Sequence, residues 1–176
     1  MIVMGVDPGS RVTGWGVISL EGNRVQCVDF GAVRTIRGGR QTPPIADRLK
    51  TIYEEIDAVL VKHRPEVVAV EGVFYAVNIK SALTLGHVRG VILFAAAFRS
   101  IPIVEFSPLE VKKAVVGVGR ADKGQVQMMV QRLLNLRQLP EPHDASDALA
   151  LALCQAFNGS QEKRRQRRWR SYEVQK

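Results

Sequence analysis

The first thirty residues contain three short apolar segments that follow one another with only brief interruptions. Residues 1–7 (MIVMGVD), 13–20 (TGWGVISL) and 24–31 (RVQCVDFG) are rich in β-branched residues and are separated by Gly, Pro and Asn. Such segments between turn residues are typical of strands, and spacers this short join antiparallel neighbours. The chain is therefore predicted to begin with a three-stranded antiparallel meander.

Beyond residue 44 the pattern changes to an alternation of helices and strands. Apolar residues recur at spacings of three and four between Ile45 and Val59, which predicts an amphipathic helix. The apolar runs 66–71 and 101–106 predict two strands, and strands joined through helices are parallel. Further helices are expected at 78–99, from 108, at 123–135 and from 142. We expect an α/β fold in which one mixed five-stranded sheet, three strands antiparallel and then two parallel, has helices on both faces.

The size and charge of the chain indicate one folded domain with a basic end. With 176 residues and 46% hydrophobic content, the chain can bury one sizeable core, expected over residues 1–158. Residues 163–176 hold seven Lys or Arg and one Glu, which is six of the eight net positive charges. We expect residues 159–176 to be a disordered basic tail that either touches a polyanion or an acidic partner, or only aids solubility. No signal-like start and no bilayer-length apolar run stand out, so a cytoplasmic protein without membrane association is expected.

Two of the predicted strands end in a carboxylate. Asp7 closes the first strand, and Glu71 closes the strand at 66–71. A right-handed crossover makes such strands parallel, so if they are neighbours their carboxyl ends share one edge of the sheet. Two buried like charges in contact raise a pKa sharply unless a cation lies between them, and this points to a divalent metal ion.

A second pair of acids lies at the start of the last predicted helix. Asp144 and Asp147 are three residues apart and share a helix face, although an ordinary N-cap has the same composition. Residues 148–154 are apolar all round, which requires the helix to be buried. Packed on the sheet, this helix would bring its acids to Asp7 and Glu71. Four carboxylates without a neighbouring Cys favour a hard ion such as Mg²⁺ or Mn²⁺.

Four blocks of the sequence together resemble the motifs of one nuclease family. The blocks are GVDPGSRVTGWG (5–16), VEGVFYAVN (70–78), VKKAVVGVGRADKGQV (111–126) and DASDALALAL (144–153). In this order, with acids at the matching places, they are similar to the RuvC-type Holliday junction resolvases of the ribonuclease H-like superfamily. The resemblance covers residues 1–157.

The resemblance implies a homodimeric, Mg²⁺-dependent crossover junction endodeoxyribonuclease of homologous recombination and DNA repair. Such an enzyme nicks two like-polarity strands of a four-way DNA junction symmetrically and receives junctions from a branch-migration helicase complex. Two Mg²⁺ would serve each active site, and Mn²⁺ would substitute for them. The metal-binding and catalytic acids would be Asp7, Glu71, Asp144 and Asp147. Lys112 and Lys123 match lysines near the scissile phosphate, and Phe74 matches an aromatic that stacks on a base at the opened crossover.

The helix expected at 78–99 is apolar over more of its circumference than one packing face needs. Gly86 and Gly90 are four residues apart and would allow a second helix to approach closely. The resemblance implies a dimer built around this helix, and its two-fold symmetry suits a four-way junction.

Two other classes of function are compatible with parts of the sequence. The stretch DPGSRVTGWG also resembles the first phosphate loop of sugar kinases and actin-like ATPases, but that fold needs a second lobe, for which 176 residues leave no room. A junction-binding protein without catalysis would lack one of the four acids, and all four are present. Among the other polar residues, Glu105 is expected to be structural and Asp122 to cap the helix that contains Lys123. His143 either ligates a metal beside Asp144 or, as is more common for a histidine near a helix start, has no role in the site.

Overall fold

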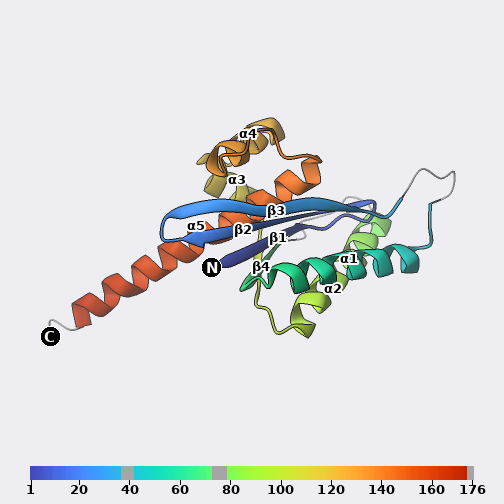
Figure 1. Cartoon of the computed structure of the whole chain (residues 1–176), viewed down its shortest axis with the longest axis horizontal. Helices are drawn as coiled ribbons and strands as arrows, with labels where there is room; N and C mark the ends of the chain where they lie inside the picture. The colour runs from blue at the N-terminus through green and yellow to red at the C-terminus, as the bar shows by residue number, and fades with distance from the viewer. Residues whose placement is uncertain (37–41, 73–78, 174–176) are drawn as a thin grey trace.

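The computed structural model describes residues 1–36, 42–72 and 79–173, with side chains through residue 159. The strands are β1 (Ile2–Asp7), β2 (Val12–Glu21), β3 (Arg24–Arg34), β4 (Val67–Glu71) and β5 (Ile103–Phe106). The helices are α1 (Ile45–His63), α2 (Ile79–Phe98), α3 (Pro108–Val116), α4 (Lys123–Leu133) and α5 (His143–Glu173). The strands form one sheet in the order β3-β2-β1-β4-β5 (Figure 1). Strands β3, β2 and β1 are antiparallel, and β1, β4 and β5 are parallel, so the predicted mixed sheet is confirmed.

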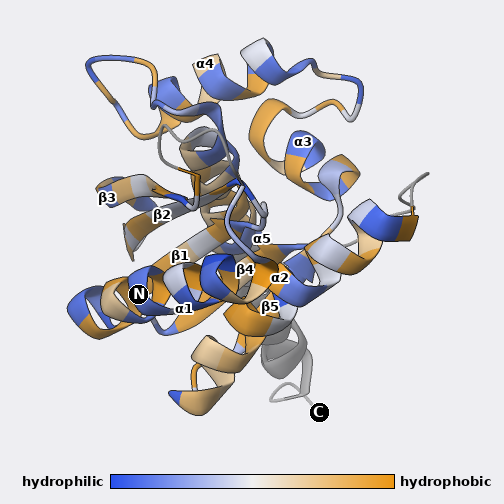
Figure 2. Cartoon of the chain, turned by 90° about the vertical axis from the view of Figure 1, so that its right-hand side faces the viewer, coloured by the Kyte–Doolittle hydropathy of each residue, from blue (hydrophilic) through white to orange (hydrophobic). Residues whose placement is uncertain are grey.

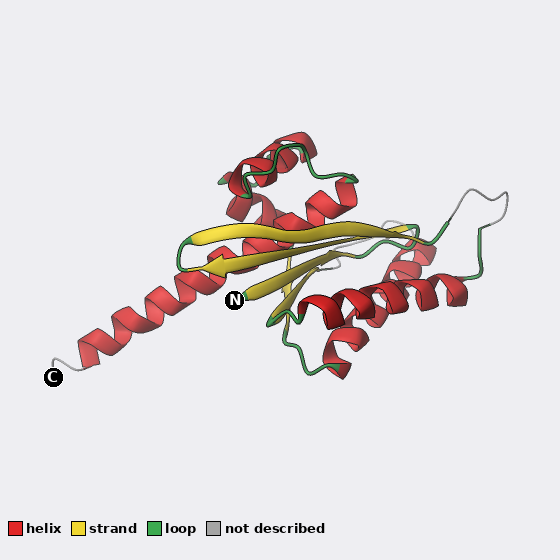
Figure 3. Cartoon of the chain, viewed as in Figure 1, coloured by secondary structure: helices red, strands yellow, loops and turns green. Residues whose placement is uncertain are grey.

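Both faces of the sheet are covered because the central strands send alternate apolar side chains to opposite sides. On β1, Val3 belongs to one core, and Met4 and Val6 belong to the other. On β4, Ala69 belongs to the core that contains Val3, and Val68 belongs to the opposite core. Helices α3, α4 and α5 close the core that contains Val3, and α1 and α2 close the opposite one (Figure 3).

Three glycines allow α5 to lie directly on the central strands. Gly5 and Gly16 are opposite each other across β1 and β2, and Gly14 lies two residues closer to the loop that joins these strands. A Cβ atom at Gly5 would be 1.9 Å from the carbonyl oxygen of Ala148, and one at Gly14 would be 1.9 Å from that of Asp144. Ordinary contact begins at 3.4 Å, so the helix backbone leaves no room for a side chain here. We call Gly5, Gly14 and Gly16 the glycine seat.

Helices α3 and α4 each begin at a capping box. The box fixes the first residue of each helix and therefore the position of each lysine along it. Ser107 and Glu110 exchange side-chain and backbone hydrogen bonds at the start of α3. Asp122 and Gln125 do the same at the start of α4, which confirms the expected cap at Asp122. Lys123 is therefore the first residue of α4.

Helix α5 is longer than expected. Its backbone is helical as far as Glu173, so residues 159–173 continue the helix where we expect a disordered tail. Gln, Glu, Lys and Arg are strong helix formers, and a helix that is already nucleated adds residues without a new nucleation cost. The extension projects away from the sheet (Figure 1). The domain boundary at residue 158 stays a prediction.

Candidate active site

The carboxyl ends of β1 and β4 place two acids side by side. The parallel register pairs Val6 with Val70, so Asp7 and Glu71 are the next residues at the same edge of the sheet. Asp7 and Glu71 share a side-chain hydrogen bond. Two carboxyls this close favour a shared proton or a bound cation over two negative charges.

The glycine seat brings the acids of α5 to this edge. Because Gly14 has no side chain, the main chain at Asp144 lies directly on it, close to the end of β1. Asp144 and Asp147 both act electrostatically on Asp7. The four acids predicted from the sequence therefore lie at one edge of the sheet.

Burial and mutual repulsion raise the pKa of three of these carboxyls. Burial, followed by Glu71, Asp147 and Asp144, raises the pKa of Asp7 to about 8. Burial also raises the pKa of Glu71, with Asp147 adding to the effect. The pKa of Asp147 is raised by burial and further by Asp144. At neutral pH the metal-free site therefore retains protons that a bound cation would displace.

Lys123 is the lysine that the structure places next to the acids. Its Nζ lies 3.7 Å from Oδ2 of Asp147. Lys123 lowers the pKa of Asp7, Glu71 and Asp147, although it does not overcome the effect of burial. Its side chain is 81% exposed, so the ammonium can also reach a group outside the protein.

Of the two remaining predicted site residues, Lys112 is not among the groups that act on the acids, and Phe74 is not described. Lys112 is half-buried on α3, and the described cations that lower the pKa values of the acids are Lys123 and His143. Phe74 lies in the segment 73–78, outside the described residues.

The turn directly after β1 is held by residues that the sequence analysis did not single out. Thr13 Oγ1 donates a hydrogen bond to the Gly9 carbonyl (2.7 Å) and accepts one from the Gly9 N–H (3.3 Å). The Ser10 carbonyl accepts from Thr35 Oγ1 at 2.7 Å and from Arg48 Nη1 at 3.1 Å. The signal in the sequence is a Thr at the start of a largely apolar strand, and Thr13 is fully buried. These contacts fix the turn that follows the first acid.

Arg89 of α2 is the second feature that the sequence analysis missed. Its Nη1 donates to the carbonyl oxygen of Glu71 at 2.8 Å, and its guanidinium forms an ion pair with Glu105 of β5. The ion pair agrees with the expected structural role of Glu105. A single Arg inside the apolar stretch HVRGVILF is the signal that could have identified it, because a charge on a packed helix needs a partner.

The oxygen ligands at this edge of the sheet suit a hard divalent cation. All four acids offer oxygen ligands, and burial with like charges penalises their ionised forms until a cation is present. Within the described residues, no group of three or more His, Cys, Asp or Glu side chains is already arranged to hold one ion. If these carboxylates hold one ion, they must turn toward a common point.

A mixed sheet of this strand order, with helices on both faces, is the ribonuclease H-like fold, and comparison with known proteins identifies the family to which the chain belongs. The family model described as "Crossover junction endodeoxyribonuclease RuvC" matches residues 3–155. The chain belongs to the RuvC family of crossover junction endodeoxyribonucleases. This confirms the enzyme class expected from the sequence, and membership implies dependence on a divalent metal ion.

Individual members of the family match this chain over most of their length. The RuvC protein of Alkaliphilus oremlandii is 47% identical over 91% of this chain and 95% of its own. The structure of Thermus thermophilus RuvC matches with a TM-score of 0.83 and 34% identity, over 92% of this chain and 97% of that one. The same Thermus thermophilus protein in complex with a Holliday junction substrate matches with a TM-score of 0.84 and 34% identity, over 90% and 94% of the two chains. The family match ends before the basic extension of α5.

Proposed function

We propose that this protein resolves Holliday junctions as a homodimer, by nicking two like-polarity strands of a four-way DNA junction symmetrically. The observation that supports this most directly is the cluster of Asp7, Glu71 and Asp147 at the sheet edge, with pKa values raised by burial and mutual repulsion, in a RuvC-family chain. The related Thermus thermophilus protein in complex with a Holliday junction substrate supports the choice of DNA. The reaction would serve recombination and repair in the cytoplasm, on junctions supplied by a branch-migration helicase complex.

The proposed cofactor is Mg²⁺, two ions per active site, for which Mn²⁺ would substitute. When bound, the metal supplies an activated water and neutralises the leaving 3′ oxygen. The ligands would be Asp7, Glu71, Asp144 and Asp147. Asp7 has to lose its proton first, because a carboxylate coordinates a metal and a carboxylic acid does not.

The lysines and Phe74 would act on the DNA rather than on the metal. Lys123 is exposed beside Asp147, so its ammonium can approach the non-bridging oxygens of a phosphate that lies over the acids. Lys112 on α3 would hold the phosphate in place. Phe74 would stack on a base at the opened crossover, a contact worth about 1–3 kcal/mol.

The proposed dimer would form through the exposed flank of α2. Within the described residues, α2 is the one helix long and apolar enough to cross a bilayer, yet Val88 and Ile92 pack it on the sheet. Only 22% of its apolar window is buried, so the described residues leave much of this helix uncovered. Figure 2 shows orange, apolar turns along α2. The exposed apolar residues on it are Ile79, Leu83, Phe94 and Phe98.

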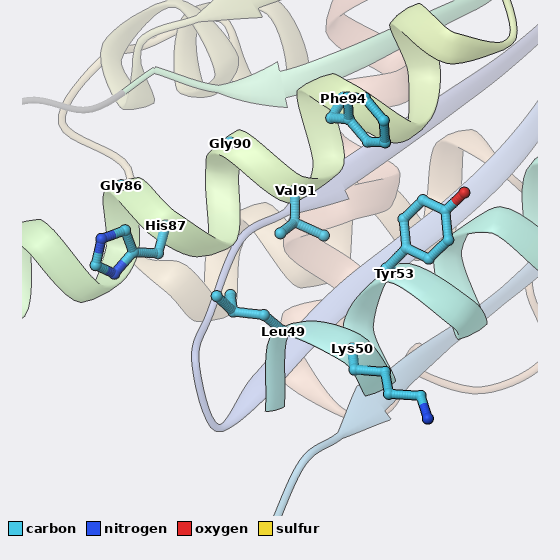
Figure 4. Close-up of a pocket in the computed structure, with 8 residues that line it drawn as sticks. All are labelled: Leu49, Lys50, Tyr53, Gly86, His87, Gly90, Val91 and Phe94. Atoms are coloured by element: carbon cyan, nitrogen blue, oxygen red, sulfur yellow. The ribbon is translucent and has the colours of Figure 1, made fainter. Parts of the chain in front are cut away.

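A groove between α1 and α2 gives this surface a shape that a second helix fits. The groove has a volume of about 500 Å³, and Tyr53, Val91 and Phe94 lie along it (Figure 4). Gly86 and Gly90 also line it, and a Cβ atom at either would meet open space. A second copy of α2 could therefore approach closely at these glycines, as the spacing in the sequence suggests.

The proposed function is tested by incubating the purified protein with an end-labelled four-way junction and Mg²⁺. We expect paired nicks on opposing strands of the junction, no cleavage of a linear duplex, and no cleavage in EDTA. Asp144→Asn should bind the junction but not cut it, because the amide keeps the shape of the carboxylate without its charge. Asp57→Asn, which removes an acid that pairs with Arg99 and does not act on the cluster, is the matched control and should cut normally. A wild-type protein inactive with both Mg²⁺ and Mn²⁺ would refute the function, and full cleavage by Asp144→Asn would remove that residue from the site.

A further inference from the structure

Arg89 connects three elements at the edge where the acids lie. It is the single Arg of α2, and only 13% of its side chain is exposed. One nitrogen of its guanidinium donates to the main-chain carbonyl of Glu71 at 2.8 Å, and another pairs with the carboxylate of Glu105. A guanidinium has several donors in a fixed plane, so one side chain can hold both partners at once.

The hydrogen bond from Arg89 reaches Glu71 at a position where β4 is no longer paired with β1. The register of β1 with β4 ends at the pair Val6–Val70, one residue before Glu71. On the other side, Glu71 is paired with Phe106 of β5, and the adjacent Gly72 N–H donates to the Phe106 carbonyl at 2.9 Å. The hydrogen bond from Arg89 adds a fixed point on the main chain of Glu71 itself.

We propose that Arg89 is a positioning residue, which holds the main chain of Glu71 so that its carboxylate is aimed at the metal. This inference rests on the proposed function, in which Glu71 is a metal ligand. The guanidinium contacts the main-chain carbonyl of Glu71 and the carboxylate of Glu105, so its role is not that of a counter-charge to the Glu71 carboxylate. Glu105 has a supporting role, because its ion pair keeps the guanidinium in the orientation that reaches Glu71.

The test compares Arg89→Met with a matched control, Arg99→Met. Arg99 directly follows α2 and forms a two-pronged ion pair with Asp57 of α1 at 2.6 Å, so its loss also removes a buttress of α2 but does not touch the acids. Binding of Mn²⁺ is measured without DNA from the loss of the free-ion EPR signal, and the Mg²⁺ concentration for half-maximal junction cleavage is measured separately. Thermal unfolding and molecular mass in solution report on the fold and the dimer.

We expect Arg89→Met to weaken Mn²⁺ binding and to raise the half-maximal Mg²⁺ concentration by about 10-fold to 100-fold, the usual effect of losing a group that orients a metal ligand. Arg89→Lys should recover part of this affinity, because the ammonium keeps donors for the carbonyl or Glu105 but lacks the two separated nitrogens of a planar guanidinium that hold both partners in place. Arg99→Met should lower the melting temperature without changing either metal measurement. Excess Mg²⁺ should restore much of the cleavage rate of Arg89→Met.

Each alternative outcome has a distinct signature. If Arg89→Met lowers the melting temperature but binds Mn²⁺ like the wild type, Arg89 is merely structural and the inference is wrong. If Arg89→Met does not fold, Glu105→Gln takes its place, since this half-exposed side chain can change without breaking the core, and unaltered Mn²⁺ binding there overturns the inference. Glu71→Gln is measured in parallel, and full cleavage by that variant would overturn the proposed role of Glu71 instead.

Discussion

Adding one methyl group at the glycine seat should separate the acids of α5 from those of the sheet. In Gly14→Ala, the new Cβ would stand 1.9 Å from the carbonyl oxygen of Asp144 and 2.2 Å from its carbonyl carbon. Both atoms belong to the main chain, so no side-chain rotation relieves the clash. The start of α5 or strand β2 must move by about 1.5 Å to reach ordinary contact, and such overpacking costs about 1–3 kcal/mol.

The same shift should affect catalysis more than stability. A misplacement of about 1 Å at a catalytic group can cost about 100-fold in rate, so cleavage by Gly14→Ala should fall by at least this factor. The melting temperature should fall by roughly 2–4 °C for each kcal/mol in a chain of this size. Junction binding should change little, because the proposed DNA contacts do not involve α5 packing.

The control for this substitution is Gly159→Ala near the end of the described side chains of α5. A Cβ there would lie 3.6 Å from Nε2 of Gln155, which is ordinary contact, so cleavage and stability should be unchanged or slightly improved. Cleavage by single-turnover assay and unfolding by calorimetry decide the question. If Gly14→Ala cleaves at the wild-type rate with an unchanged melting temperature, the close seating of α5 is refuted.

Four further predictions concern pH, the dimer, Phe74 and the extension of α5. The folded-state pKa of Asp7 is about 8 against 3.8 for the free residue, so folded protein binds more protons than unfolded between these values. The melting temperature in EDTA should therefore fall as pH rises from 4 to 8, Asp7→Asn should flatten the slope, and an unchanged slope in that variant would contradict the assignment. Phe94→Glu should give a monomer by light scattering and lose paired nicking, and a dimeric variant would place the interface elsewhere. Phe74→Ala should slow cleavage, a junction with a pre-opened centre should restore much of the rate, and no recovery would argue that Phe74 is only a core residue. Deletion of 159–176 should weaken junction binding in EDTA and make log K less steep against log salt by about 0.9 for each phosphate that the extension neutralises, whereas parallel lines would mean that the extension does not touch DNA.

The strands of the sheet were predictable because short, local sequence patterns specify them. Short β-branched segments, brief turns and the change to helical spacing predict all five strands and their directions, and the parallel crossover places Asp7 beside Glu71. The boundaries differ by a few residues, as for β3, which continues to Arg34 where the sequence predicts an end at residue 31. The grouping of the acids followed from the same reasoning, although their role as ligands stays a prediction.

What the sequence did not reveal depends on contacts between distant elements. The glycine seat is visible as glycines in GVDPGSRVTGWG, but only the packing of α5 shows which main-chain atoms need the space. The partners of Arg89 lie 18 residues away at Glu71 and on another strand at Glu105, and no periodicity predicts such a pairing. The extension of α5 differs for another reason: its dense positive charge is typical of a disordered tail, whereas its Gln, Glu, Lys and Arg residues also have a high helix propensity.

Helix α2 is where the proposed catalytic site and the proposed dimer interface meet, and the helix geometry shows that they use different sides of it. Phe94 follows Arg89 by five residues, which at 3.6 residues per turn places it about 140° around the helix. The side that carries Arg89 is tied to Glu71 and Glu105, whereas Phe94 is 58% exposed on the flank beside Tyr53. A change at Phe94 should therefore alter pairing of the nicks and leave Mn²⁺ affinity unaffected, while a change at Arg89 should alter Mn²⁺ affinity and leave the mass of the dimer unaffected. Because the two variants affect different measurements, loss of both properties in either one would mean that α2 transmits the state of the interface to the metal site.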